Sequence, residues 1–142
     1  MSDEIPRSID IAKIGPGRFK ATNERGGETF FGLGGEDPDF TPVELLLAAI
    51  AGCSALDVEA LTSKRAASTG FTVHAEGDKA RDEGGNRLTS IRVTFDVRFP
   101  EGAEGDAARG RLPGAIEMSR DRLCTVSRTV QLGAGVTYDQ TV

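Results

Sequence analysis

The stretch Thr41-Pro-Val-Glu44-Leu-Leu-Leu-Ala-Ala-Ile-Ala-Gly-Cys53-Ser-Ala-Leu56 decides the fold. It opens with a hydroxyl that can cap a helix, a proline suited to the first helical position, and Glu44 three residues after the cap. From Leu45 to Leu56 the apolar residues cover almost the whole helical circumference, whereas Glu59 to Arg65 are mostly polar. The stretch therefore predicts a long helix that begins after Thr41 and is buried on all sides.

Small side chains recur along this helix at helical spacing, namely Ala48, Ala51 or Gly52, and Ala55. Side chains of this size let another backbone approach closely. The partner is either a sheet of the same chain or the same helix of a second subunit. In the second case, a buried site would be shared between two chains.

Short strands are predicted before the helix. Residues Arg18 to Thr22 alternate polar and apolar side chains, Glu24 to Gly27 form a turn, and Thr29 to Gly32 resume an extended run. Gly34 to Asp39 form a loop that leads to the helix.

After Gly70 the pattern has period two, which predicts an antiparallel hairpin with one solvated face. Its turn lies at Asp82 to Asn86, and His74 falls on the polar face, so we expect a surface histidine rather than a catalytic base. The core-facing side chains are Phe71, Val73, Ala75, Ile91, Val93, Phe95, Val97 and Phe99.

The segment Glu101 to Gly114 is acidic and contains glycine and proline, so we expect a loop or a broken helix there. Further on, Cys124 precedes a short helical run that Gly133 closes, and Gly135 to Tyr138 predict a last strand. Residues 1–142 are the size of one α+β domain.

Composition excludes several classes of function. The formal net charge is −5, and the chain has no Trp and one Tyr, so it lacks the basic surface and aromatic platform of nucleic-acid binding. The sequence shows neither a signal peptide nor an apolar run of about 18 residues. We therefore expect a cytoplasmic protein with no nucleic-acid or membrane partner.

The two cysteines, Cys53 and Cys124, are far apart in the sequence. This spacing fits neither a disulfide-dense scaffold nor a close redox motif, and together with His74 they cannot fill a four-ligand zinc site, so we expect no metal. They are either two packed thiols or one distant redox couple.

A thiol reacts as the thiolate, and a helix N-terminus such as that beside Cys124 favours an anion. Arg128, four residues on, either assists or is solvated. Cys53 lies in the most apolar stretch, and Asp57 at i+4 opposes its ionisation. The residues alone thus favour Cys124 as the nucleophile.

The stretch Thr41 to Val58, together with Cys124-Thr-Val-Ser-Arg-Thr-Val130, resembles the two cysteine segments of the OsmC/Ohr family. The order of elements agrees over nearly the whole chain. Thr125 stands where a proline often follows the second cysteine, which suggests the broader OsmC-like branch. The resemblance implies an α+β fold of antiparallel sheets around a long buried central helix, in an interlocked homodimer with sites at the interface.

The resemblance also implies roles for both cysteines. Cys53 would attack an organic hydroperoxide and become a sulfenic acid, and Cys124 would resolve it to a disulfide. An external dithiol, of the lipoyl type or a small thiol, would reduce that disulfide. No cofactor would be needed.

By the same resemblance, an arginine from the N-terminal strands would hold Cys53 as the thiolate. Arg18 is the candidate, with Arg25 as the alternative. A glutamate near the helix start would orient that arginine. The best-known peroxidase branches carry it at the position of Val43, so Glu44 is either this residue or only a helix cap.

The sequence therefore predicts a thiol-dependent hydroperoxide reductase of oxidative-stress defence. One alternative is a non-catalytic OsmC-like domain that binds a small apolar or thiol-reactive ligand at the dimer crevice. Another is a dimeric structural module without a ligand.

Overall fold

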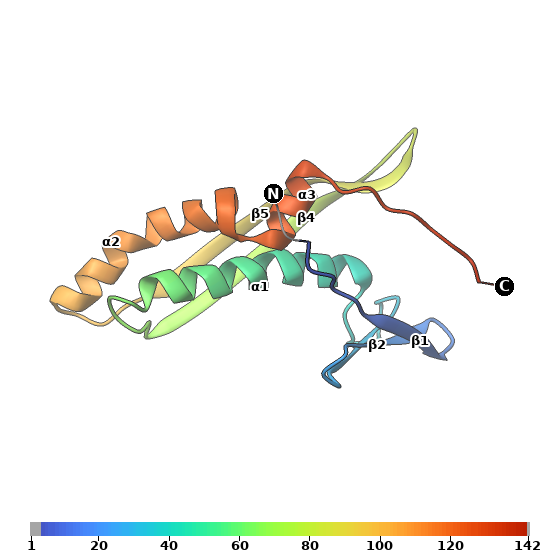
Figure 1. Cartoon of the computed structure of the whole chain (residues 1–142), viewed down its shortest axis with the longest axis horizontal. Coiled ribbons are helices and arrows are strands. Elements are labelled where there is room, and N and C mark those ends of the chain that lie inside the picture. The colour runs from blue at the N-terminus through green and yellow to red at the C-terminus, as the bar shows by residue number, and fades with distance from the viewer. Residues whose placement is uncertain (1–3, 142) are drawn as a thin grey trace. The chain divides into compact units, whose positions relative to one another are not determined.

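The computed structural model describes residues 4–141, and the chain divides into two compact units, with the boundary in the sequence between Leu46 and Leu47. The expected single domain over residues 1–142 stays a prediction, and its residues 1–3 and 142 lie outside the described part. The elements are β1 (Asp10–Gly15), β2 (Arg18–Thr22), β3 (Glu28–Phe31), α1 (Pro42–Thr62), β4 (Gly70–Asp82), β5 (Gly85–Arg98), α2 (Ala103–Met118), a π-helical turn η1 (Ser119–Leu123) and α3 (Thr125–Leu132) (Figure 1).

The N-terminal unit is a three-stranded antiparallel sheet in the order β1-β2-β3. Phe19 pairs with Phe31 across β2 and β3, and their rings stack with centroids 5.7 Å apart. The predicted turn between these strands is confirmed, since Asn23 Oδ1 accepts a hydrogen bond from the Gly27 N–H at 2.8 Å. Strand β1 was not expected, because its exposed residues show little of the alternation that marks a strand.

Helix α1 begins where the sequence predicts. Thr41 Oγ1 accepts a hydrogen bond from the Glu44 N–H at 3.2 Å, and Glu44 Oε1 accepts one from the Thr41 N–H at 2.8 Å. This reciprocal capping box satisfies two amides at the helix start, with Pro42 in the first position.

Burial along α1 is confined to one side of the helix. The buried residues are Ile50, Ala51, Ser54, Val58 and Thr62, whereas Leu56 is 70% exposed. The helix is long and apolar enough to span a membrane by length and composition alone. Asp57 lies near its middle, and charged side chains are rare within membrane-spanning segments.

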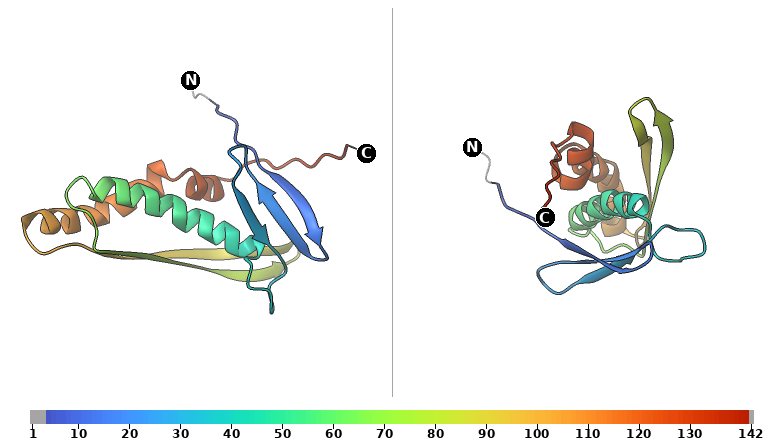
Figure 2. Two further views of the ribbon diagram at one scale, coloured as in Figure 1. Left: turned by 90° about the horizontal axis from the view of Figure 1, so that it is seen from below. Right: turned by 90° about the vertical axis from the view of Figure 1, so that its right-hand side faces the viewer.

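The predicted hairpin is formed by β4 and β5, and both strands are longer than the apolar pattern indicated. Val73 pairs with Phe95 on the half-buried face, and Phe71 meets Phe95 edge to face. His74 is exposed on the other face, as expected. The views in Figure 2 place the helices of this unit on one face of the hairpin.

The expected loop or broken helix at Glu101 to Gly114 is wrong, because α2 runs through it as one helix. Gly105 lets α2 pack closely against Pro100, which follows the C-terminal end of β5. Any other residue at position 105 would bring its β-carbon into collision with the Pro100 carbonyl. Arg109 donates to the Phe99 carbonyl at 3.2 Å and binds Asp106 at 2.7 Å. These contacts hold the start of the helix in place, although proline and glycine cost about 3 and 1 kcal/mol per residue in a helix interior.

Of the two elements predicted after Cys124, the helix forms and the strand does not form in the part of the chain that the structure describes. Helix α3 forms directly after Cys124 and ends at Gly133, where φ is 80°. The strand expected at Gly135 to Tyr138 does not form within the described residues, and Tyr138 is 92% exposed. A strand needs a hydrogen-bonding neighbour, and the described part of the unit offers none to this segment.

Candidate functional site

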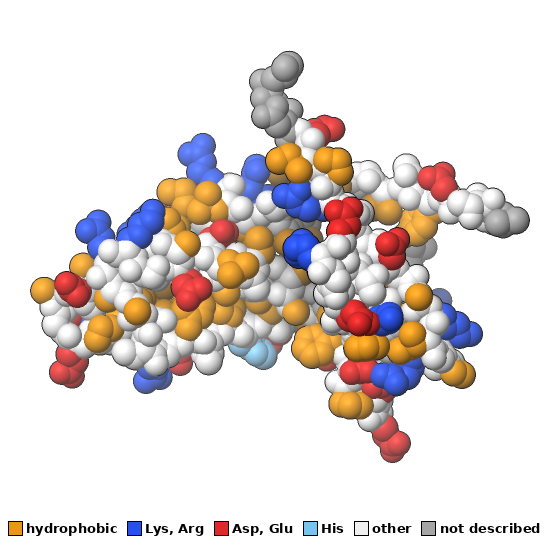
Figure 3. All heavy atoms as spheres, turned by 60° about the horizontal axis from the view of Figure 1, so that its bottom comes forward, with side chains coloured by type: hydrophobic (Ala, Val, Ile, Leu, Met, Phe, Trp, Pro, Cys, Tyr) orange, Lys and Arg blue, Asp and Glu red, His pale blue; other side chains and the backbone are white. Residues whose placement is uncertain are grey.

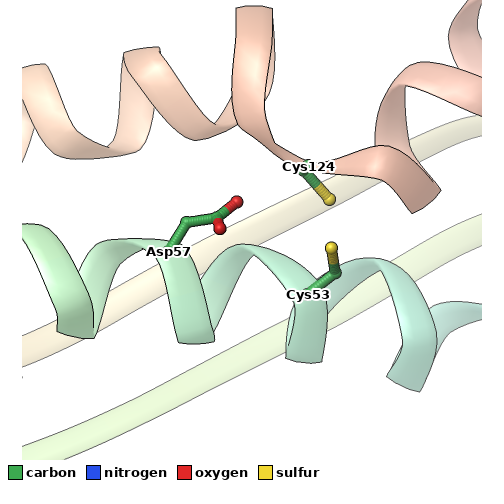
Figure 4. A group of neighbouring side chains, drawn as sticks. All are labelled: Cys53, Asp57 and Cys124. Carbon is green, nitrogen blue, oxygen red and sulfur yellow. The ribbon is translucent and has the colours of Figure 1, made fainter. Parts of the chain in front are cut away.

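Two cysteines and one carboxylate meet inside the C-terminal unit. The Sγ atoms of Cys53 and Cys124 and a carboxylate oxygen of Asp57 all lie within 4.8 Å of one another. Figure 4 shows Cys53 and Asp57 rising from α1 toward Cys124, which points down from the chain between η1 and α3. The fold thus brings together thiols that are distant in the sequence.

Cys124 is fully buried, with 0% of its surface exposed. It caps α3, since its Sγ accepts a hydrogen bond from the Ser127 N–H at 3.3 Å. Its S–H points to the Ile50 carbonyl at 4.0 Å, which is a weak bond that a protonated thiol can donate. The predicted position of Cys124 at a helix N-terminus is confirmed.

Cys53 is half-buried in the middle of α1. Burial raises the pKa of its thiol, Cys124 and Asp57 raise it further, and a hydrogen bond from the Val126 N–H lowers it. The first turn of α3 therefore directs one backbone amide at each sulfur. Sequence reasoning missed the contact of Val126 with Cys53, because only the packing of α3 against α1 creates it.

Asp57 lies one helical turn after Cys53 and so faces the same side of α1. Its Oδ2 accepts a hydrogen bond from the Ser119 hydroxyl at 2.9 Å. Ser119 is only 1% exposed, and its carbonyl accepts the Cys124 N–H at 2.9 Å across η1. The π-helical turn thus presents Ser119 and Cys124 together to α1, an arrangement that the sequence did not indicate.

Within the C-terminal unit, the causes of the shift in the pKa of Cys53 are burial, the Val126 amide, Cys124 and Asp57. Arg128 lies on α3, where it lines a small surface pocket beside Arg122. Any role of Arg128 in activating a thiol stays a prediction.

The other candidates belong to the N-terminal unit, where Arg18 binds the carboxylates of Asp37, at 3.3 Å, and Asp39. Arg25 lies in the turn before β3, and Glu44 is held in the capping box. The roles of Arg18, Arg25 and Glu44 at Cys53 therefore stay predictions.

The cluster of Cys53, Asp57 and Cys124 is also the one group of potential metal ligands found among residues 4–141. Two sulfurs and one carboxylate oxygen are three of the four donors that tetrahedral zinc takes in proteins, so an ion here would keep one open position. The expectation that the protein works without a metal stays a prediction.

A pocket of about 430 Å³ lies in the same unit, and Cys53, Asp57 and Cys124 are not among its lining residues. This volume is in the range of small-molecule sites, roughly 300–1,000 Å³. Ile50 and Ser54 contribute to its wall from α1, and Ser54 directly follows Cys53. The remaining lining residues are Leu88, Thr89, Ser90, Ile91, Val93, Phe95, Ile116, Arg120, Ser127, Val130 and Gln131.

Comparison with solved structures shows that the fold recurs. A hypothetical protein from Aquifex aeolicus is 19% identical with a TM-score of 0.71, over 91% of this chain and 89% of that one. An OsmC-like protein of unknown function from Vibrio cholerae is 13% identical with a TM-score of 0.74, over 90% and 95%. An organic hydroperoxide resistance protein from Legionella pneumophila is 15% identical with a TM-score of 0.59, over 92% of each chain.

At these identities the similarity establishes the fold, and it confirms the predicted α+β class with antiparallel sheets. A search of curated protein sequences finds no match. A family model described as OsmC-like protein matches residues 34–139, a range that contains Cys53, Asp57 and Cys124. The chain therefore belongs to the OsmC-like protein family.

Proposed function

We propose that the protein reduces organic hydroperoxides, with Cys53 as the attacking thiol and Cys124 as the resolving thiol. One observation carries this proposal: a half-buried sulfur and a fully buried sulfur lie within 4.8 Å of each other. A peroxide with an organic substituent has access only to the more exposed sulfur. Cys53 is therefore the better candidate for the attacking thiol, although helix position alone favoured Cys124.

The chemistry balances without a cofactor. The Cys53 thiolate attacks the terminal peroxide oxygen, the O–O bond breaks, and the alkoxide leaves and takes a proton to become an alcohol. Cys124 then attacks the Cys53 sulfenic acid, a disulfide forms and water leaves. An external dithiol reduces the disulfide and is itself oxidised to a disulfide.

Membership of the OsmC-like family and the fold shared with the organic hydroperoxide resistance protein from Legionella pneumophila support a redox role in oxidative-stress defence. We propose that the pocket of about 430 Å³ in the same unit receives the organic part of the peroxide, since β5 and α3 supply it with apolar side chains such as Phe95 and Val130.

The raised pKa of Cys53 means that the thiolate needs further stabilisation beyond the Val126 amide. We propose Arg18 as the source of that positive charge, with Arg25 as the alternative. Asp37 and Asp39 already hold Arg18, whereas Glu44 is engaged by the Thr41 amide. These contacts favour the aspartates over Glu44 as the residues that orient the guanidinium.

We further propose a cytoplasmic homodimer. Large apolar side chains are exposed in the C-terminal unit, with Leu56 at 70%, Leu132 at 73% and Val136 at 72%. Figure 3 shows hydrophobic side chains spread over the visible surface. A second copy that covers them would also meet the expectation that α1 is buried on all sides.

The test is consumption of cumene hydroperoxide in the presence of a dithiol. Wild-type protein should consume the peroxide catalytically, and Cys53→Ser should not. Ser63→Ala is the matched control, because it alters an exposed residue directly after α1, outside the pocket, and leaves both thiols in place. Absence of turnover in the wild type would reject the proposal.

The pocket of about 430 Å³ and the raised pKa of Cys53 also favour a second candidate, a domain that binds a small apolar ligand without catalysis. That candidate predicts slow labelling of Cys53 by iodoacetamide near neutral pH and no peroxide consumption. Rapid labelling would argue against it.

A further inference from the structure

The resolving step needs a proton acceptor beside Cys124. When Cys124 attacks the sulfenic acid, its thiol proton must leave, and the hydroxide expelled from Cys53 must gain a proton. The S–H of Cys124 points to the Ile50 carbonyl, which accepts a hydrogen bond but does not take up a proton. Another group must therefore carry the proton from one sulfur to the other.

Asp57 has the required position. One of its carboxylate oxygens lies within 4.8 Å of both sulfurs, a distance that a proton crosses through one water molecule. Ser119 anchors the side chain: its buried hydroxyl donates a hydrogen bond to Asp57 Oδ2 at 2.9 Å and holds the carboxylate toward the cluster. The side chain is thus oriented by a neighbour that itself takes no part in the reaction.

We propose that Asp57 is the proton-transfer residue of the resolving step, and that Ser119 positions it. This inference rests on the proposed peroxide reduction. As the Cys124 sulfur attacks Cys53 and the S–O bond breaks, the Cys124 proton passes to the Asp57 carboxylate. From there it passes to the departing hydroxide, so the products are a disulfide, water and an unprotonated Asp57.

The negative charge of Asp57 opposes the first step, in which the Cys53 thiolate attacks the peroxide. A carboxylate beside Cys53 disfavours the thiolate, and Asp57 is one of the groups that raise the pKa of Cys53. Removal of the charge should therefore make Cys53 ionise more readily and react faster, while the resolving step slows. Opposite effects on the two steps are a signature that a general disturbance of the packing would not produce.

Asp57→Asn is the test variant, since asparagine keeps the shape and an oxygen that can still accept the Ser119 hydrogen bond. Glu59→Gln is the matched control, because it removes the same charge from an exposed position two residues further along α1. Reduced samples receive one equivalent of cumene hydroperoxide, and intact mass after rapid quenching counts sulfenic acid and disulfide. Labelling with iodoacetamide at neutral pH measures the reactivity of Cys53.

We expect Asp57→Asn to accumulate sulfenic acid and to form the disulfide about 10²-fold more slowly. Its alkylation should be faster by a factor of about 3 to 5. Glu59→Gln should match the wild type in both measurements. Disulfide formation at the wild-type rate in Asp57→Asn, or slowing of both reactions together, would overturn the inference and leave the proposed function intact. If wild-type protein loses no thiols, the proposed function fails, and this inference with it.

Discussion

The middle of α1 and the start of α3 each supply one sulfur to the same cluster, but the two sulfurs differ in burial and in hydrogen bonding. At the start of α3, Cys124 is fully buried and caps a helix, and its backbone N–H is bound by Ser119. In the middle of α1, Cys53 is half-buried and interacts with the Val126 amide and the Cys124 thiol. One thiol is held as a structural cap, and the other is left open to a reactant.

A position at a helix N-terminus therefore does not by itself identify the nucleophilic thiol. The amides of α3 stabilise an anion at either sulfur, because Ser127 and Val126 are adjacent in the same turn. Access then decides which sulfur reacts first. For this reason the thiol nearest the helix start is the better resolving residue.

The largest effect that distinguishes the two regions is expected from Cys124→Ser. The variant keeps the attacking thiol, so it should lose its one thiol to cumene hydroperoxide and accumulate a sulfenic acid that dimedone traps. Turnover with a dithiol should fall about 10²-fold, since the intramolecular thiol is gone. Wild-type turnover in this variant would show that Cys124 has no resolving role.

The pH dependence of labelling comes next in size. With the contacts of the C-terminal unit alone, the raised pKa leaves Cys53 mostly protonated through the ordinary range of a thiol, so its alkylation rate should rise about tenfold per pH unit there. We expect this profile in Arg18→Gln, which removes the proposed positive charge. In the wild type the rate should level off at lower pH, and equal profiles in the two proteins would show that Arg18 does not act on Cys53.

The same shift links pH to stability. Without the Arg18 charge, the folded protein holds the Cys53 proton more tightly than the unfolded chain does, so this group favours folding below the ordinary thiol pKa. The contribution is lost as pH rises toward the folded value. Thermal denaturation of Arg18→Gln and of the double variant Arg18→Gln/Cys53→Ser across this range measures it, with a smaller decrease expected in the double variant.

The packing of α2, the helix that leads to η1 and Cys124, can be tested separately with Gly105→Ala. The added methyl meets the Pro100 carbonyl, so the first turn of α2 must move, at a cost of about 1–3 kcal/mol. Gly110→Ala is the control, since no atom lies near its β-carbon position and the change should stabilise the helix by about 1 kcal/mol. Urea denaturation would measure both, and equal effects would contradict the packing described.

The smallest effect is expected at the start of α1. Thr41→Ala removes the hydroxyl of the capping box and should lower stability by about 1 kcal/mol. Cys53 lies several turns further along, so its labelling rate should not change. A changed labelling rate would mean that the cap and the thiol are coupled.

Local patterns predicted α1, the hairpin and the place of Cys124, because capping residues and period-two alternation act over a few neighbouring positions. They failed at α2, where the close approach of Gly105 to Pro100 and the carbonyl contacts of Arg109 outweigh Pro113. They also failed at the last expected strand, around Val136, since a strand depends on a neighbour that the local sequence does not reveal.

The candidate site was predicted in its residue types but not in its geometry. The effect of Asp57 on Cys53 follows from their spacing of four on one helix. The proximity of the two sulfurs, the Val126 amide and the Ser119 contact all depend on how η1 and α3 pack against α1. Such contacts between distant segments leave no short-range signal in a single sequence.

The central claim is that Cys53 and Cys124 act as one redox pair. Free-thiol titration and intact mass, before and after one equivalent of cumene hydroperoxide, test it most directly. The account predicts that both thiols disappear together and that the mass falls by two hydrogens. Two thiols that remain titratable after the peroxide is added would contradict it.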